Sequence, residues 1–314
     1  ILPVSGTREA LFQIALSAVA LGAPKGKTKV LMGNPFYHAY AGAAAVAGGE
    51  PVFLAADRAH GFMPALDAIG ETLAETAMVY LCSPANPQGS VASLDYLKRW
   101  LELARRHDFL IAADECYAEI YSGEPPAGTL EAARDTGGAV DHLLVFHSLS
   151  KRSSAPGLRS GFVAGDAKFV ARQAQLINYG GVATPLPLLA AATRLWQDEA
   201  HVAANRARYR RNFELAQEIL GPLFGEVRPQ GGFFLWLEVG DGEGVAVELW
   251  RQAAIKVLPG GYMARADVGG RNPGAAFIRV ALVQDPEETA GALRRMAKVL
   301  EPMMTRKVQR AAGR

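Results

Sequence analysis

The residues whose types and spacing are best suited to carry out a reaction lie between positions 148 and 161, in the sequence SLSKRSSAPGLRSG. A single lysine, Lys151, stands there among small hydroxyl residues, after the apolar run 143–146 and before a Pro-Gly turn. At the end of a buried strand, loss of water lowers the pKa of a lysine amine and makes it nucleophilic. Arg159 follows eight positions later and can return to the same place to bind an anion. This pairing predicts a lysine that bonds covalently to a phosphate-bearing aldehyde such as pyridoxal 5′-phosphate (PLP).

Asp114 directly follows the apolar run 110–113, and Tyr117 comes three positions later. Ligands bind at the carboxyl ends of strands in open α/β sheets, so a carboxylate there can face a cofactor. It would pair with the protonated ring nitrogen of PLP and keep the ring an electron sink. The Tyr117 hydroxyl would donate to the phenolic oxygen of the ring. Taken alone, Asp114 could instead cap the next turn, and Tyr117 could be a core aromatic.

Asn86 lies in the loop SPANPQG, residues 83–89, again directly after an apolar run. Two prolines extend this loop and orient the Asn side chain, whose amide could reach the phenolic oxygen of PLP and the substrate. The alternative is that Asn-Pro and Gln-Gly only shape a turn. Tyr37, in the segment 34–37, could stack on the cofactor ring or belong to the core.

Three small residues precede the first predicted helix: Ser5, Gly6 and Thr7. Free N–H groups at a helix N-terminus attract phosphate, so this turn is a candidate phosphate cradle. Ser148, Ser150 and Arg159 would complete the site, since the arginine fork binds phosphate bidentately. An ordinary helix cap is the alternative for the first three residues.

Arg279 is a charged residue inside an otherwise apolar predicted strand, residues 276–280. A buried arginine needs an anionic partner. That partner is either an internal carboxylate or the carboxylate of an amino-acid substrate, and the second alternative makes Arg279 and Asn86 the candidate substrate-binding residues.

The elements that must position these residues alternate up to about residue 165, as in a mostly parallel sheet covered by helices on both faces. Strands are expected at 29–32, 51–54, 78–82, 109–113, 143–146 and 162–165, and helices at 6–21, 37–47 and 93–107. Because parallel strands end at one edge, the residues that follow them are expected to meet there.

The pattern changes after Pro185. Residues 186 to about 221 are predicted to be almost continuously helical, and an α+β region follows with strands at 233–237 and 276–280 and a helix at 245–254. A last helix should begin at Pro286, with Asp285 as N-cap and Glu288 completing a capping box. The tail from about Thr305 is predicted to be disordered. We therefore expect a large α/β domain over residues 1–195 and a connector helix with a small α+β domain over 196–314.

Composition narrows the classes of protein to which this chain can belong. The chain has 314 residues, of which 50% are hydrophobic, and its net charge of +2 indicates neither nucleic acid nor a membrane surface as a partner. No apolar run reaches the roughly 18 to 20 residues of a membrane span. Cys82 and Cys116 are interpreted as buried, reduced thiols of a cytoplasmic protein, and without paired histidines they predict no metal site. Because the chain starts abruptly at Ile1, which is not an initiator methionine, we expect a missing N-terminal segment.

The order of these residues resembles the fold-type-I PLP-dependent aminotransferases of class I/II. The loop 83–89 looks like the SPxNPTG loop of that family, with Gln88 where Thr is usual. Residues 114–117 resemble its D-E-x-Y element, and residues 148–161 are similar to its S-x-S-K…G-x-R-x-G signature. The resemblance runs over essentially the whole chain.

The resemblance implies an α/β fold with a mostly parallel seven-stranded sheet in a large domain and a smaller α+β C-terminal domain. It also implies PLP held on Lys151, with Asp114 and Tyr117 as the other catalytic residues, and a cytoplasmic homodimer with shared active sites. The substrates would be amino acids and 2-oxo acids, with amino groups exchanged between glutamate and its partner.

Three phrases, at residues 3–12, 146–153 and 157–166, look like the N-succinyldiaminopimelate aminotransferases of lysine biosynthesis. The predicted substrate is therefore N-succinyl-LL-2,6-diaminopimelate. The alternatives are an aspartate, aromatic or alanine aminotransferase, a C–S lyase, or an inactive truncated protein of this fold. Arg152 or Arg265 could bind a distal carboxylate, although Arg152 could equally be a structural charge. Residues 178–181 receive no role.

Overall fold

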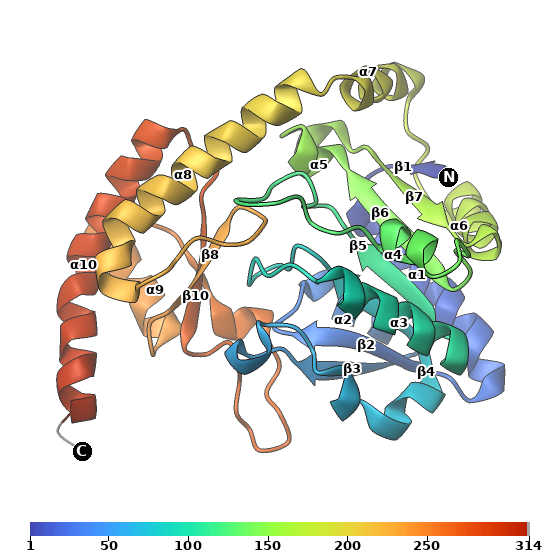
Figure 1. Ribbon diagram of the computed structural model, residues 1–314, viewed down its shortest axis with the longest axis horizontal. Helices are drawn as coiled ribbons and strands as arrows, with labels where there is room; N and C mark the ends of the chain where they lie inside the picture. The colour runs from blue at the N-terminus through green and yellow to red at the C-terminus, as the bar shows by residue number, and fades with distance from the viewer. Residues whose placement is uncertain (313–314) are drawn as a thin grey trace.

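The computed structural model describes residues 1–312 and arranges them around two β-sheets (Figure 1). The larger sheet has seven strands in the order β1-β7-β6-β5-β4-β2-β3, and the smaller has three in the order β8-β10-β9. The strands of the larger sheet are β1 (Leu2–Val4), β2 (Lys29–Asn34), β3 (Glu50–Ala55), β4 (Thr76–Cys82), β5 (Leu110–Asp114), β6 (Leu143–Ser148) and β7 (Gly161–Gly165).

Within this sheet, β7 runs opposite to both of its neighbours, and the other pairings are parallel. The mostly parallel seven-stranded α/β architecture is therefore confirmed. β1 is an addition to the predicted strands, because three residues are too few to show a period. The register pairs Cys82 with Asp114 and Asp114 with Phe146, so β4, β5 and β6 end at one edge.

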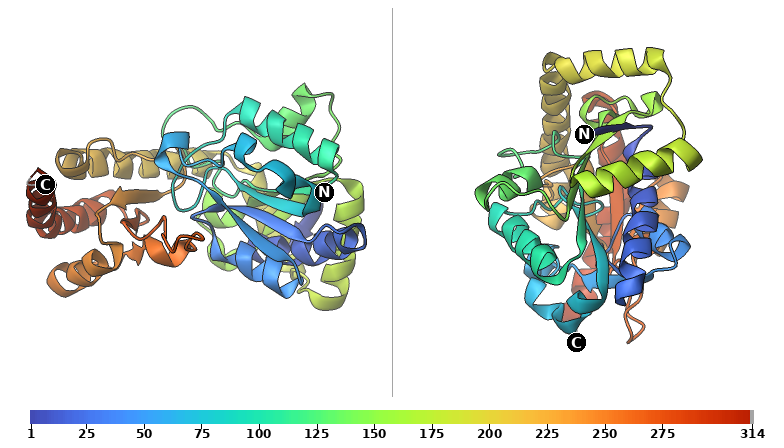
Figure 2. Two further views of the ribbon diagram at one scale, coloured as in Figure 1. Left: turned by 90° about the horizontal axis from the view of Figure 1, so that it is seen from below. Right: turned by 90° about the vertical axis from the view of Figure 1, so that its right-hand side faces the viewer.

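Helices cover both faces of the larger sheet. They are α1 (Thr7–Gly22), α2 (His38–Val46), α3 (Leu94–His107), α4 (Thr129–Asp135), α5 (Leu149–Arg152) and α6 (Ala167–Gly180). Along β4, Met78 and Tyr80 join the apolar cluster that contains α1, whereas Val79 and Leu81 join the cluster that contains α3. The right-hand view of Figure 2 shows α3 (teal) and α1 (blue) on opposite sides of the strands. No helix in the described part of the chain is both long and apolar enough to cross a membrane.

The smaller sheet consists of β8 (Phe234–Glu238), β9 (Leu258–Pro259) and β10 (Phe277–Ala281). It shares an apolar core with α8 (Ala200–Phe224), α9 (Gly242–Ala253) and α10 (Pro286–Ala312). Asp285 is the expected cap of α10, because its Oδ1 accepts a hydrogen bond from the Glu288 N–H at 3.0 Å. Since α10 continues to Ala312, the predicted disorder from about Thr305 is wrong up to that residue, and the rest of the tail lies outside the described residues.

Residues 186 to about 221 are almost continuously helical, as predicted, but one break divides the region into two helices. α7 (Leu186–Gln197) ends before Asp198, and α8 begins at Ala200. The Asp198 backbone is extended, and its Oδ1 accepts a hydrogen bond from the Ala200 N–H at 2.9 Å. Side-chain capping of this kind competes with helix continuation. Figure 1 shows α8 bridging the distance from α7 to α10.

Arg152 holds this helix junction from the neighbouring α5. Its side chain is only 6% exposed, and its Nη1 donates to the Leu195 carbonyl at 2.8 Å. Its Nη2 forms an ion pair with Glu199, and its guanidinium lies 5.1 Å from the centre of the Trp196 ring. The structure therefore assigns Arg152 the structural role that the sequence left open.

We expect Arg152→Met to lower the free energy of unfolding by about 1–3 kcal/mol, because the half-buried Leu195 carbonyl loses the donor that the buried Arg152 side chain supplies. Urea unfolding followed by circular dichroism measures this difference. As a control, Glu199→Gln changes an exposed carboxylate and should cost less than about 1 kcal/mol. An unchanged unfolding midpoint for Arg152→Met would show that other contacts hold the junction.

Candidate active site

A cavity of about 310 Å³ opens beside the shared ends of β4, β5 and β6 and extends to β8 and β10. Most of the predicted site residues line it: Thr7, Tyr37, Asn86, Asp114, Tyr117, Ser148, Ser150, Lys151, Arg159 and Arg279. They come from segments up to 272 residues apart along the chain, from Thr7 to Arg279. The structure thus brings together side chains whose proximity was only inferred from strand ends.

Lys151 lies in the short helix α5. Ser148 caps the N-terminus of this helix, because its Oγ accepts a hydrogen bond from the Ser150 N–H at 3.1 Å. The Lys151 amine lies 4.9 Å from the centre of the Phe233 ring and 5.5 Å from that of Tyr117. Burial lowers the pKa of this amine. Among the described residues no carboxylate forms an ion pair with it, so the surroundings favour the neutral, nucleophilic amine.

Asp114 is buried at the end of β5, where two donors hold its carboxylate. The Tyr40 hydroxyl donates to Oδ2 at 2.5 Å, and the Cys116 N–H donates to Oδ1 at 3.2 Å. Burial, reinforced by the Asp114 charge, raises the pKa of Tyr40 well above its usual range, so its hydroxyl remains a donor. Sequence reasoning missed Tyr40, although it lies one helical turn after Tyr37 and so shares its face.

Asn86 and Arg279 contact each other across the two sheets. Arg279 Nη1 donates to Asn86 Oδ1 at 2.8 Å, and its guanidinium lies 4.1 Å from the centre of the Phe234 ring. Burial lowers the pKa of Arg279. The described residues provide no carboxylate in ion-pair contact with Arg279. This half-buried cation can therefore accept an anion from outside the chain.

Tyr117 and Tyr37 also border the cavity. Tyr117 packs edge-on against Phe233 and Phe234, and burial raises the pKa of its hydroxyl well above the usual range. Tyr37 is half-buried, and its hydroxyl accepts a hydrogen bond from Arg8 Nε at 2.6 Å. Both tyrosines therefore line the same cavity as the lysine, and the protonated hydroxyl of Tyr117 can act as a donor there.

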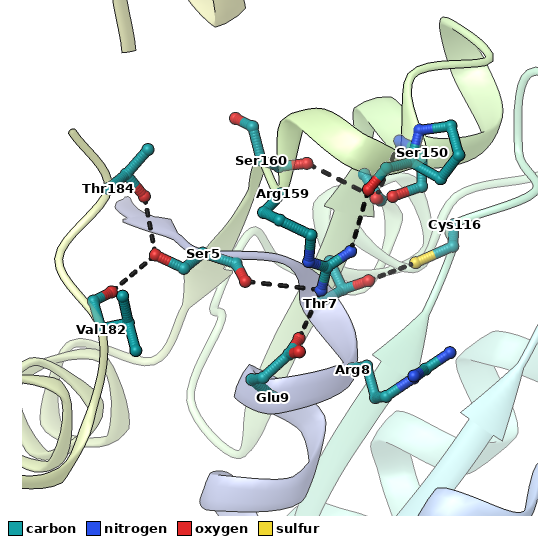
Figure 3. A network of polar contacts seen from close by, with 12 residues as sticks. Ser5, Thr7, Arg8, Glu9, Cys116, Ser150, Arg159, Ser160, Val182 and Thr184 are labelled. Atoms are coloured by element: carbon teal, nitrogen blue, oxygen red, sulfur yellow. Dashed lines mark hydrogen bonds and ion pairs between the residues drawn. The ribbon is translucent and has the colours of Figure 1, made fainter. Parts of the chain in front are cut away.

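Figure 3 shows the turn before α1 with Arg159 above it. The Gly6 φ of 94° suits glycine, and a Cβ there would collide with the Arg159 guanidinium. Arg159 Nη2 donates to Glu9 Oε2 at 2.6 Å and to the Ser5 carbonyl at 3.5 Å. An arginine and a helix N-terminus thus converge around a residue that has no side chain, as a phosphate cradle requires.

Not every expected residue faces this cavity. The Ser5 hydroxyl donates to the Val182 carbonyl at 2.6 Å and contacts Thr184 Oγ1 at 2.8 Å. Ser5 and Gly6 line an adjacent cavity of about 340 Å³, together with Gly180 and Gly181. The segment 178–181 therefore contributes to that second cavity. Arg265 is absent from the residues lining the first, and its guanidinium lies 5.7 Å from the centre of the Phe36 ring.

The donor set fits PLP. Asp114 is a buried carboxylate without a cationic partner among the described residues, which suits a protonated ring nitrogen. Thr7, Ser148, Ser150 and Arg159 line the same cavity and offer hydroxyl groups and a guanidinium to a phosphate, while Lys151 supplies a desolvated amine. Within the described part of the chain, no cluster of three or more His, Cys, Asp or Glu could hold a metal ion.

Comparisons with known proteins agree with this arrangement. A family model described as "Aminotransferase class I and II" matches residues 1–296. The 4-dedimethylamino-4-oxo-anhydrotetracycline transaminase OxyQ of Streptomyces rimosus is 34% identical over 70% of the chain and 59% of that protein. The LL-diaminopimelate aminotransferase of Syntrophobacter fumaroxidans is 31% identical over 95% of the chain and 75% of that protein.

A solved aminotransferase structure from Neisseria meningitidis matches with a TM-score of 0.87 and 42% identity, covering 95% of this chain and 76% of the other. The chain spans between 59% and 75% of the length of the curated relatives that it matches. The family match extends over most of the chain and includes the lysine cavity. The chain therefore belongs to the class I and II aminotransferases, a family of PLP-dependent enzymes.

Proposed function

We propose that the whole protein is a transaminase that exchanges an amino group between glutamate and a 2-oxo acid. One observation carries this proposal: the desolvated amine of Lys151, the carboxylate of Asp114 and the guanidinium of Arg279 line the same cavity. Neither Asp114 nor Arg279 forms an ion pair with any residue that the structure describes. An amino acid that reacts on PLP requires an amine that bonds the cofactor, a carboxylate for the ring nitrogen and a cation for its own α-carboxylate, and these three groups can supply them.

PLP supplies the electron sink that stabilises negative charge on the substrate α-carbon. Lys151 would hold the cofactor, and once displaced by the substrate its amine would take the proton from the α-carbon. Burial against Phe233 and Tyr117 supports this role, because it favours the neutral amine that a general base requires.

Asp114 would keep the ring nitrogen protonated, and Tyr40 would hold the Asp114 carboxylate in place through its hydrogen bond to Oδ2. Tyr117 and the amide group of Asn86 would donate to the phenolic oxygen of PLP. Asn86 Oδ1 already accepts a hydrogen bond from Arg279, so its NH₂ group remains available as the donor.

Arg279 would bind the α-carboxylate of either substrate. Its fork suits a carboxylate, and the Asn86 contact and the Phe234 ring orient the guanidinium. A substrate held there would present its α-carbon to Lys151 in a fixed orientation, which lowers the entropic part of the barrier.

The proposed amino-group partner is N-succinyl-LL-2,6-diaminopimelate, in lysine biosynthesis. Two lines support it: the phrases at residues 3–12, 146–153 and 157–166, and the similarity to proteins named as LL-diaminopimelate aminotransferases.

The proposal extends to the assembly of the protein. It includes a large domain of residues 1–195, a connector helix with a small domain of residues 196–314, and a cytoplasmic homodimer with shared active sites. The separate apolar cores of the two sheets support the division.

The free cysteines suit a reducing compartment. Tyr179 and Leu186, which are 88% and 79% exposed, offer apolar surface for a second subunit.

Purified protein mixed with PLP should show an absorption band between about 400 and 430 nm that shifts when glutamate is added. The band should be lost in Lys151→Ala, because this variant has no amine to bond the cofactor. Absorption spectroscopy after removal of free PLP tests both expectations. A Lys151→Ala protein that keeps the band would contradict the assignment of the lysine.

A substrate panel tests the proposed partner. With glutamate as amino donor, the keto acid related to N-succinyl-diaminopimelate should give a kcat/KM at least about tenfold above oxaloacetate, pyruvate and phenylpyruvate. Coupled assays of 2-oxoglutarate formation give these values. A preference for pyruvate would reject the substrate while leaving the transaminase proposal in place.

The lowered pKa of Lys151 also predicts a pH dependence of stability in the PLP-free protein. The unfolded chain keeps this proton up to the usual pKa of 10.5, whereas the folded chain releases it at lower pH. Folding therefore releases a proton between the two values, so stability relative to Lys151→Met should rise with pH in that window and be constant below it. Urea unfolding at a series of pH values measures this, and Lys168→Met at an exposed site is the matched control. A difference that does not change with pH would contradict the prediction.

A further inference from the structure

One arginine of the Lys151 cavity has no task in the reaction described above. Arg8, the second residue of α1, lines the cavity beside Tyr37 and His38. Its Nε donates to the Tyr37 hydroxyl at 2.6 Å. Figure 3 shows its side chain directed away from Glu9 and Arg159, so it does not belong to the phosphate cradle around Gly6.

Arg8 is also a cation without an anionic partner in the described part of the chain. The adjacent acidic residue, Glu9, is bound to Arg159 instead. The Arg8 fork is thus oriented through Nε, while its two terminal nitrogens form no hydrogen bond or ion pair with the described residues. A guanidinium held this way is prepared for bidentate binding of a carboxylate, since little further side-chain entropy is lost.

The charge of Arg8 acts inside the cavity. Burial lowers the pKa of His38, and the charges of Arg8 and Arg279 lower it further. The same two arginines also lower the pKa of Lys151. Arg8 and Arg279 therefore both contribute positive potential to the cavity that Lys151 lines. Arg8 does so from α1, on the side of the larger sheet, and Arg279 from β10 of the smaller sheet.

The other charged groups of the cavity have partners within the chain or in the proposed reaction. Arg159 is paired with Glu9 and lies beside the proposed phosphate position, Arg279 is assigned to an α-carboxylate, and Asp114 is assigned to a ring nitrogen. The Arg8 side chain is exposed, lines the cavity and forms an ion pair with no described residue. A second carboxylate on the substrate would give it an anionic partner, which a substrate with one carboxylate cannot do.

We propose that Arg8 binds the distal carboxylate of the substrate, and that the enzyme selects dicarboxylic amino acids and 2-oxo acids on both sides of the exchange. This inference rests on the proposed transaminase function. It also explains how one site would accept glutamate and a chemically different partner, because both would carry a second carboxylate that reaches the same arginine.

The first test compares Arg8→Gln with the wild type, using 2-oxoglutarate and its monocarboxylic analogue 2-oxobutyrate as amino acceptors. The ratio of kcat/KM for the two acceptors should fall about 10- to 100-fold in Arg8→Gln, mainly through KM, since one charge-assisted contact is lost. Arg8→Lys should recover part of the ratio, because an ammonium keeps the charge but not the fork. Arg106→Gln, at an exposed arginine of α3, should leave the ratio unchanged.

The second test does not depend on turnover. Glutarate, a dicarboxylate without an amino or oxo group, is titrated into PLP-reconstituted protein, and the change in visible absorption gives its dissociation constant. Arg8→Gln should weaken glutarate about tenfold or more and should weaken butyrate less. Tyr37→Phe keeps the ring and removes the acceptor of Arg8 Nε, so it should produce a smaller loss in the same direction.

Two outcomes would overturn the inference. Equal losses for dicarboxylic and monocarboxylic ligands would make Arg8 a general source of positive potential. A weaker affinity of the apoprotein for PLP and for inorganic phosphate, with an unchanged ratio, would make it a phosphate ligand. If the wild type shows no transamination with any acceptor, the proposed function fails, and the glutarate titration still decides whether Arg8 binds a second carboxylate.

Discussion

The site depends on one constraint, which is the parallel pairing of β4, β5 and β6. This pairing places the loop of Asn86, the carboxylate of Asp114 and the helix of Lys151 at the same sheet edge. Side chains alternate between the two faces of a sheet, so a shift of β5 by one residue would turn Asp114 from the cavity toward the opposite face. The fully buried apolar residues of these strands, among them Leu110, Ile111 and Leu144, make such a shift costly.

The second sheet completes the site with aromatic rings and a half-buried cation. β8 brings Phe234 and β10 brings Arg279, while the neighbouring Phe233 packs beside the Lys151 amine. These rings exclude water from an amine and a guanidinium, which lowers the pKa of both groups. The site therefore exists only between the two sheets. The α7–α8 junction, held by Arg152, connects them next to the lysine itself.

Much of the fold and the site could be predicted from the sequence, because the relevant signals are local. Apolar runs identified the buried strands, and polar residues directly after these runs identified Asn86, Asp114 and Lys151. The misses have physical reasons. Tyr40 looks like an ordinary aromatic of α2, and only the packing of α2 brings its hydroxyl to Asp114. Glu9 looks like a first-turn acid of α1, and its partner Arg159 is 150 residues away. The break at Asp198 depends on a side-chain cap that competes with helix propensity.

The sequence by itself indicated the class of chemistry, because an aspartate and a lysine that each come after an apolar run, followed by a Gly-x-Arg segment, together favour PLP chemistry. Only the tertiary structure decided which charges form ion pairs within the chain. Arg152 and Arg159 are paired with Glu199 and Glu9, whereas Arg8 and Arg279 line the cavity without a carboxylate among the described residues. The physical reason is that Coulomb interactions depend on distance in space and on burial, and the spacing of charges along a chain specifies neither.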